Sequence, residues 1–237
     1  MKPIYTRILL KLSGEGLAGE NKSGVDSTVV ERLAAEISRV RKAGVQVCLV
    51  VGGGNFFRGA KNAADFMDRS VADQVGMMAT VMNSLILKSA LEAADCPTDV
   101  YSGLAVPQAC ETYSFRHAKA SLEAGKAVIF AGGTGSPYFT TDTCATLRAA
   151  EMHCDVLMKA TQVDGVYDSD PRSNPQAKRF DSISYSEVID KRLKVMDITA
   201  VAMAQEASLP IMIFAQSEPD AIIKAVCGEV KHTIIKA

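Results

Sequence analysis

The chain has 237 residues, with 26 Lys and Arg against 27 Asp and Glu, so its formal net charge is -1. Hydrophobic residues make up 48% of the sequence, enough apolar surface to offset chain entropy and exclude an intrinsically disordered protein. The balanced charge argues against a protein that coats nucleic acid or a membrane surface, because such proteins usually carry a basic excess. No apolar run reaches the roughly 18–20 residues of a bilayer span. The apolar stretch near the N-terminus is broken at Lys11, so it does not resemble a signal peptide.

The cysteines and histidines show no metal-binding pattern. The six cysteines are Cys48, Cys96, Cys110, Cys144, Cys154 and Cys227. None forms a Cys-x-x-Cys pair, and their spacing matches neither a zinc site nor a disulfide-rich secreted domain. The three histidines are scattered. We therefore expect reduced, structural cysteines in a cytoplasmic protein without protein metal ligands.

Strand-like and helix-like segments alternate along the chain. In chain order we predict a strand at 6–12, a helix at 28–43, a strand at 45–51, a long helix at 69–94, a short strand around Val100, a helix at 114–124, a strand at 127–131, a helix at 141–152, a strand from 156, a helix at 195–207, a strand at 211–214, a helix at 220–226 and a strand at 232–235. Thr28 and Glu31 resemble a capping box, and Gly44 stands where a C-terminal cap falls. Residues 164–182 are loop-rich, and we expect one domain over 1–237. The alternation predicts an α/β fold with a mostly parallel sheet.

Three glycine-rich turns follow three predicted strands, at 11–16, 52–55 and 132–137. In open α/β sheets, ligands bind at the carboxyl ends of the strands, where such turns lie. Glycine lets backbone N–H groups surround phosphate oxygens, and Lys11 and Arg58 add cations. The turns match neither a P-loop nor a dinucleotide fingerprint. Any single turn could merely connect a strand to a helix, but three together favour a phosphate site.

A fourth segment, 157–171, places Lys159 at a strand end before a polar turn. Tyr167 can cover a base, and Asp170 can accept from a ribose hydroxyl. The alternative interpretation is a surface hairpin with Lys159 facing solvent, and the spacing alone leaves it open.

Six ordered segments together resemble one family. They are Lys-Leu-Ser-Gly at 11–14, Gly-Gly-Gly-Asn-x-x-Arg-Gly at 52–59, Asp-x-x-Gly-Met-x-Ala-Thr-x-Met-Asn at 73–83, Gly-Thr-Gly-x-Pro-Tyr-Phe-Thr-Thr-Asp at 133–142, Lys-Ala-Thr-x-Val-Asp-Gly-Val-Tyr at 159–167 and Lys-Val-Met-Asp at 194–197. This set, which spans nearly the whole chain, resembles the bacterial uridylate kinases of the amino acid kinase family. The resemblance implies an open three-layer αβα sandwich, a homo-oligomer, in particular a hexamer, and Mg²⁺-dependent phosphorylation of UMP by ATP in pyrimidine nucleotide biosynthesis.

The resemblance also assigns site residues. It implies an ATP site formed by Lys11, Leu12, Ser13, Gly14, Gly54, Arg58, Thr161, Gln162, Tyr167 and Asp170. It implies a UMP site formed by Gly53, Asp73, Thr134, Gly135, Ser136, Pro137, Tyr138, Phe139, Thr140 and Thr141. The part up to about residue 155 would mainly bind UMP, and the rest would mainly bind ATP.

Catalysis is expected to need no general base, because the attacking UMP phosphate is already anionic, which leaves positioning and charge neutralisation. We expect Lys11, Arg58 and Lys159 to stabilise the transferring group, and Asp142 to orient a lysine. Mg²⁺ is expected to be held mainly by ATP oxygens and water.

The resemblance extends to regulation, with UTP as inhibitor and GTP as activator. The segment that would shape the GTP response is Gly19, Glu20, Asn21, Lys22, Ser23 and Gly24. Ser136 and Tyr138 depart from the Asn and Phe of other members, but they keep hydrogen-bonding capacity and an aromatic ring.

Two alternatives stay open. One is a member of the same family with another acceptor, namely an acetylglutamate, glutamate or aspartate kinase, which should lack the pattern at 134–141. The other is a non-catalytic UMP or UTP sensor, against which the presence of Lys11, Arg58 and Lys159 counts.

Overall fold

The computed structural model of the protein describes residues 2–21, 23–57 and 66–237. Their strands form a nine-stranded sheet in the order β4-β3-β5-β2-β1-β6-β10-β11-β9. Its strands are β1 (Arg7–Leu12), β2 (Gln46–Val51), β3 (Thr98–Ser102), β4 (Glu111–Thr112), β5 (Ala127–Ala131), β6 (Val156–Thr161), β9 (Ser182–Ser184), β10 (Ile211–Ala215) and β11 (His232–Lys236). Neighbouring strands are parallel except β10 and β11. The predicted mostly parallel α/β sheet is therefore confirmed.

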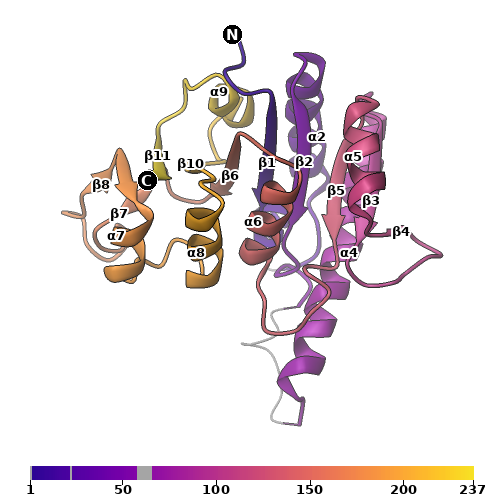
Figure 1. Ribbon diagram of the computed structural model, residues 1–237, viewed down its shortest axis with the longest axis horizontal. Coiled ribbons are helices and arrows are strands. Elements are labelled where there is room, and N and C mark those ends of the chain that lie inside the picture. The colour runs from indigo at the N-terminus through magenta and orange to yellow at the C-terminus, as the bar shows by residue number, and fades with distance from the viewer. Residues whose placement is uncertain (1, 22, 58–65) are drawn as a thin grey trace.

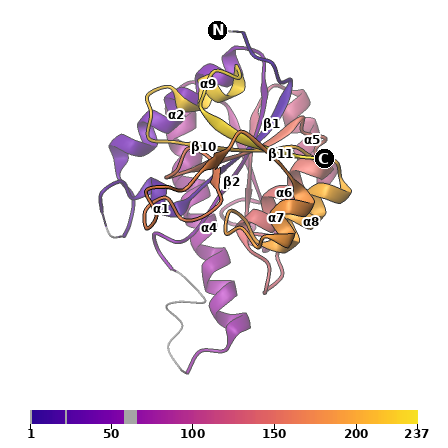
Figure 2. The ribbon, with the colours of Figure 1, turned by 90° about the vertical axis from the view of Figure 1, so that its left-hand side faces the viewer.

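Helices cover both faces of this sheet, as Figure 2 shows. They are α1 (Gly14–Leu17), α2 (Ser27–Lys42), α4 (Arg69–Ala93), α5 (Phe115–Glu123), α6 (Thr141–Glu151), α7 (Tyr185–Asp190), α8 (Ile198–Glu206) and α9 (Ala221–Val226). Buried side chains of α2, α4 and α9 share one core with the sheet, and those of α5, α6, α7 and α8 share the other. The three-layer αβα arrangement is thus confirmed.

Alternate side chains of the strand β1 lie in the two hydrophobic cores on opposite faces of the sheet. Ile8, Leu10 and Leu12 point into one core, and Leu9 points into the other; all four are fully buried. Successive side chains of a strand point to opposite faces, so a continuous apolar run is stable only when both faces are covered. In the described part of the chain, none of the helices combines the length and apolarity needed to cross a bilayer.

Most predicted helix starts lie within one residue of the observed ones, and N-cap residues explain the differences at α2 and α8. The helix α2 is capped by Asp26, whose carboxylate accepts from the backbone N–H groups of Thr28 at 2.9 Å and Val29 at 3.3 Å, so the predicted capping box at Thr28 is wrong. Aspartate is a better N-cap than threonine, and because Asp26 caps the helix, Thr28 lies inside its first turn. The helix α8 begins at Ile198 rather than at 195, because Asp197 is its N-cap. Gly44 does follow the C-cap of α2, with φ at +90°.

Several short elements were not predicted. They include α1, β4, β9, α7 and a two-stranded antiparallel sheet of β7 (Val166–Tyr167) and β8 (Arg179–Phe180). The last lies inside the loop-rich region 164–182, so that region is partly a hairpin.

The carboxyl ends of four adjacent strands, β5, β2, β1 and β6, lie along one edge of the sheet. The three glycine-rich turns follow β1, β2 and β5, and Lys159 lies near the end of β6. The long helix α4 extends past the body of the molecule in Figure 1. The fold therefore gathers all four sequence features at one edge.

Candidate active site

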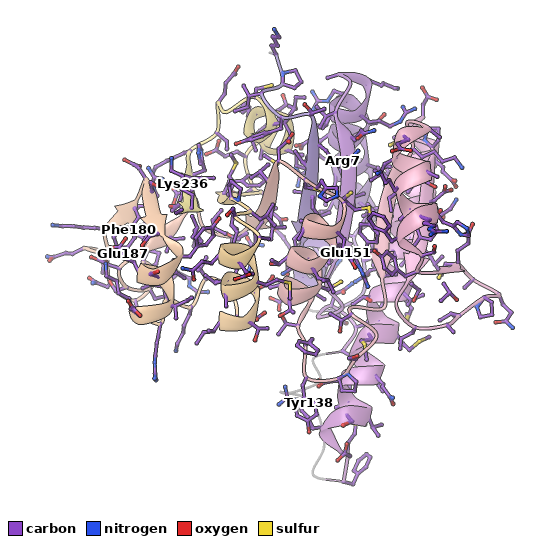
Figure 3. The ribbon with its side chains drawn as sticks, viewed as in Figure 1. Arg7, Tyr138, Glu151, Phe180, Glu187 and Lys236 are labelled. Carbon is purple, nitrogen blue, oxygen red and sulfur yellow. The ribbon has the colours of Figure 1, made fainter. Side chains whose placement is uncertain are left out.

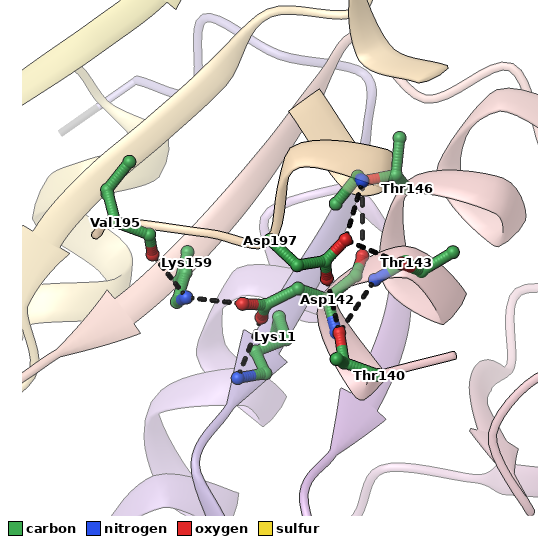
Figure 4. A network of polar contacts seen from close by, with 9 residues as sticks. Lys11, Thr140, Asp142, Thr143, Thr146, Lys159, Val195 and Asp197 are labelled. Carbon is green, nitrogen blue, oxygen red and sulfur yellow. Dashed lines mark hydrogen bonds and ion pairs between the residues drawn. The ribbon is translucent and has the colours of Figure 1, made fainter. Parts of the chain in front are cut away.

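Lys11 and Lys159 lie side by side at this edge, because they are register partners on β1 and β6. Both contact the carboxylate of Asp142, in the first turn of α6 (Figure 4). The Nζ of Lys159 lies 2.6 Å from Oδ2, and the Nζ of Lys11 lies 2.9 Å from Oδ1, an ion pair without hydrogen-bond alignment. Lys159 also donates to the backbone oxygen of Val195 at 2.6 Å. The carboxylate of Asp142 thus lies between the ammonium groups of Lys11 and Lys159.

Burial and charge act against each other in this cluster. The side chains of Lys11, Lys159 and Asp142 are only 11%, 13% and 13% exposed. Burial alone would raise the pKa of Asp142, but the two lysines outweigh it and hold the pKa below its ordinary value. Burial lowers the pKa of Lys159, and the like charge of Lys11 adds to this, while Asp142 opposes it. The site is arranged to meet further negative charge.

The turn after β2 is held by a pair of buried amides. The side chains of Asn55 and Asn83 bond each other at 2.7 and 3.1 Å, and Asn83 also donates to the backbone oxygen of Gly52 at 2.7 Å. Asn83 lies on α4 and is fully buried. A Cβ at Gly14 would lie only 2.5 Å from the oxygen of Gly52, so this turn packs directly against the first one. Glycine at 14 is required by that close approach.

A cavity of about 160 Å³ lies between this turn and α4. Five of the residues predicted for UMP line it, namely Gly53, Asp73, Phe139, Thr140 and Thr141. Thr134, Gly135, Ser136, Pro137 and Tyr138 belong to the adjoining loop but do not line the cavity. Sequence reasoning did not assign Phe57, Ala72, Gly76, Met77, Thr80 and Gly133, which also line it. The spacing of 72, 76 and 80 along one helix could have indicated a shared face.

Asp73, on α4, binds the loop at 134–139 that adjoins the smaller cavity. Its Oδ2 accepts from the backbone N–H of Tyr138 at 2.9 Å and from Nε of Arg69 at 3.2 Å. The guanidinium of Arg69 also lies 5.0 Å from the ring centroid of Tyr138, which is labelled beside α4 in Figure 3. The Asp73 carboxylate therefore already binds the loop through Oδ2, and among the described residues no donor bonds its Oδ1.

A larger cavity of about 540 Å³ lies beside β6 and the β7–β8 hairpin. Lys159, Thr161, Tyr167 and Asp170 line it, whereas Gln162 is exposed and does not. The hydroxyl of Tyr167 donates to Asp164 at 2.6 Å. The Asp170 carboxylate is engaged by Nε and Nη2 of Arg172 at 3.0 and 2.9 Å. Cationic residues that sequence reasoning did not assign also line the cavity: Arg172, Lys191, Arg192 and Lys194.

The remaining predicted residues lie around these cavities or beyond the described part. Leu12 is buried in the core, Ser13 is the N-cap of α1, and Gly54 lies in the turn after β2. Gly24, the last residue of the segment 19–24, contacts that turn, because its backbone N–H donates to the backbone oxygen of Asn55 at 3.1 Å. Arg58 and Lys22 lie outside the described residues. Over 2–21, 23–57 and 66–237, no three His, Cys, Asp or Glu side chains group as metal ligands.

Residues 6–215 match the profile of the amino acid kinase family. The chain belongs to this family. It is 49% identical over 234 residues to a uridylate kinase of Erythrobacter litoralis, a match that covers 99% of this chain and 98% of the relative.

Solved structures agree with this membership. A UMP kinase of Ureaplasma parvum aligns with a TM-score of 0.93 at 37% identity over 100% of both chains. A UMP kinase of Bacillus anthracis aligns with a TM-score of 0.93 at 36% identity, covering 98% of this chain and 96% of that one. A uridylate kinase of Archaeoglobus fulgidus gives 0.75 at 28% identity, covering 96% and 99%. The predicted resemblance to the uridylate kinases is confirmed.

Proposed function

We propose that the protein is a uridylate kinase, which transfers the γ-phosphoryl group of ATP to UMP and forms ADP and UDP. The observation that carries this proposal is the Lys11–Asp142–Lys159 cluster, which lies between the two cavities. Lys159 itself lines the larger one. Thr141, next to Asp142 in the chain, lines the smaller one. Two anionic substrates would therefore meet at a pair of ammonium groups.

We assign the smaller cavity to UMP and the larger one to ATP. The UMP site uses the part of the chain before about residue 155, and the adenosine of ATP uses the part after it. Asp73 Oδ1 is available to accept from a ribose hydroxyl. Tyr167 supplies a ring for the adenine, and Lys194 adds a further positive charge to the cavity that Lys159 lines. The single domain would thus bring both substrates to one sheet edge.

Catalysis follows from positioning and charge. The attacking group is a phosphate oxygen of UMP, which is anionic at neutral pH, so no side chain has to remove a proton. Lys11 and Lys159 stabilise the charge on the transferring phosphoryl group and on the departing ADP, with Arg58 assisting. Asp142 keeps the two ammonium groups apart and oriented. Fixed cations in a partly dry site stabilise developing charge more than water does.

ATP-dependent transfer implies a divalent metal, and we propose Mg²⁺. The carboxylate nearest the lysines, Asp142, has one oxygen facing each ammonium group, which leaves it a poor metal ligand. This donor set fits a metal held by ATP oxygens and water. When bound, Mg²⁺ neutralises phosphate charge.

An acceptor panel tests the activity. ADP release from ATP is measured with UMP, CMP, dCMP, AMP, acetylglutamate, glutamate and aspartate in parallel. We expect UMP to be the best acceptor. Preference for a carboxylate acceptor would make the protein a different kinase of its family, and UMP binding without ADP release would make it a sensor.

We propose a homo-oligomer, of which a hexamer is the expected form. Its support is an exposed apolar stripe on α4, formed by Val71, Val75, Met78 and Met82, each between 39% and 47% exposed. Spacings of four, three and four residues align these side chains along one helix face, as in helices that pair with another helix. Light scattering should give a mass several times 25.3 kDa, and Met78→Glu should lower it.

The proposal extends to regulation and location. UTP contains the same uridine as UMP and UDP, so we expect it to inhibit the enzyme by occupying the UMP site. GTP should activate through the segment 19–24, which contacts the turn after β2 through Gly24. Adding each nucleotide to the ADP-release assay tests both. The six free cysteines suit a cytoplasmic location, because that compartment keeps thiols reduced.

A further inference from the structure

Asp197 connects the start of α6, where Thr140 and Thr141 line the smaller cavity, to the start of α8, which closely follows the segment 191–195 that lines the larger one. Its carboxylate caps α8 by accepting from the backbone N–H of Ala200 at 2.8 Å. The same carboxylate accepts from the hydroxyls of Thr143, at 2.9 Å, and of Thr140. Both threonines belong to the start of α6, the helix whose first turn carries Asp142 (Figure 4). A plain N-cap needs only the first of these contacts.

The contacts continue on both sides of Asp197. Thr140 lines the smaller cavity, and its hydroxyl oxygen accepts from the backbone N–H of Asp142 at 3.0 Å. Two residues before Asp197, the backbone oxygen of Val195 accepts from Lys159, and both of these residues line the larger cavity. The segment 195–197 therefore contacts the lysine directly and reaches the carboxylate between the lysines through Thr140.

We propose that Asp197 is a positioning residue, which fixes the first turn of α6 against α8 and so holds Asp142 between Lys11 and Lys159. The inference rests on the proposed function, since it concerns the geometry of phosphoryl transfer. Because Asp197 ties the wall of one cavity to the wall of the other, it also sets the distance between the two bound substrates. A small misplacement of reacting groups costs up to about 100-fold in rate.

Asp197→Asn separates this role from capping. Asparagine caps helices about as well as aspartate does, so the bond from Ala200 is kept. Its amide nitrogen only donates, however, and cannot accept from the Thr140 hydroxyl. The matched control is Asp26→Asn, because Asp26 caps α2 and bonds no side chain of α6. We expect Asp197→Asn to lower kcat about 10-fold or more, with the KM values for UMP and ATP within about 3-fold of wild type.

A second variant tests whether Asp197 acts through its contacts with the threonines of α6. Thr143→Val removes one hydroxyl contact and keeps the shape of the side chain, the Asp197 charge and the α8 cap. We expect a smaller fall in kcat, and in the double variant with Asp197→Asn the combined loss should differ from the product of the two single losses, because both changes loosen the same turn of α6. A full product would contradict a shared network.

The backbone of α6 gives a readout that does not depend on the acceptor. Hydrogen exchange of a peptide spanning 139–146 should be faster in Asp197→Asn than in wild type and unchanged in Asp26→Asn, because Thr140 holds the N–H groups of Asp142 and Thr143. Unchanged exchange together with a kcat equal to that of Asp26→Asn would overturn the positioning role. A wild type that turns over another acceptor and not UMP would overturn the proposed function instead, and the variants would then be compared with that acceptor.

Discussion

Lys11 and Lys159 face each other across neighbouring parallel strands, and a single carboxylate, Asp142, separates their ammonium groups. Two like charges at this spacing repel each other, and both side chains are largely buried. The carboxylate compensates only one positive charge of two. The cluster therefore keeps an excess positive charge at the edge where the glycine-rich turns converge, and bound phosphate groups would balance it.

Lys159→Ala should reduce turnover much more than substrate binding. The lost ammonium group faces the transferring phosphoryl group, so its removal should lower kcat by about 10²–10³ and leave KM for UMP nearly unchanged. Steady-state kinetics with both substrates varied measures this split. Lys126→Ala is the control. Lys126 pairs with Asp99 at 3.1 Å and directly precedes β5, so it lies at the end of that strand remote from the glycine-rich turn. Near-normal kcat in Lys159→Ala would remove Lys159 from the mechanism.

Asp142→Asn should destabilise the protein in a pH-dependent way. The folded-state pKa of Asp142 is lowered, so its ionisation contributes stability above the ordinary aspartate pKa of about 4, and this contribution is lost as the pH falls through the folded value. Near neutral pH the variant should lose about 3 kcal/mol in the free energy of unfolding, because two buried cations lose their partner. Denaturant titrations from about pH 7 to about pH 3 should show this difference shrinking in acid. A difference that stays constant with pH would contradict the ionised Asp142.

Asp73→Asn should raise the KM for UMP more than the KM for ATP. The amide places a donor nitrogen where one carboxylate oxygen was, so either the Tyr138 N–H or the ribose hydroxyl would face a donor in place of an acceptor. Asp68→Asn is the matched control, because Asp68 caps the same helix through Ser70 and asparagine preserves such a cap. Equal increases in both KM values would give Asp73 a purely structural role in the loop at 134–139.

UMP should exceed CMP in kcat/KM by a factor on the order of 10⁴, because a site that hydrogen-bonds uracil leaves polar groups unpaired with cytosine. Among the predicted hydroxyls, that of Thr134 already bonds within its loop and that of Thr140 bonds Asp197. This leaves Thr141, which lines the smaller cavity, and Ser136, on the loop that adjoins it, to read the base together with backbone groups. Ser136→Ala should lower the ratio of kcat/KM for UMP to kcat/KM for CMP. Assays in which UMP and CMP compete as acceptors measure this ratio. A wild-type ratio near one would mean that this segment does not read the base.

Periodic patterns predicted most of the regular structure, because buried strands and amphipathic helices leave a local signal. The runs at 45–51 and 127–131 became central strands, and the long apolar segment from 69 became α4. Short elements such as α7 and the β7–β8 hairpin left too few residues for a period to be recognised.

The glycine-rich turns and Lys159 could be placed at one sheet edge from the sequence, since parallel strands bring their carboxyl ends together. The contacts that hold the site could not. Asn83 supports Gly52 from 31 residues away, and Asp197 reaches Thr143 from 54 residues away. Such contacts depend on how helices pack, and no local spacing encodes them. The cations of the larger cavity were missed for the same reason, because Arg172 and Lys191 line one cavity only when the hairpin folds beside α7.

The most direct test of the proposed reaction follows the phosphoryl group itself. The protein is incubated with ATP labelled in its γ-phosphate, Mg²⁺ and UMP, and the nucleotides are separated. We predict that the label moves into the terminal phosphate of UDP with equal formation of ADP, and that omitting UMP abolishes both. Label that stays in ATP, or that appears in inorganic phosphate without UDP, would contradict phosphoryl transfer to UMP.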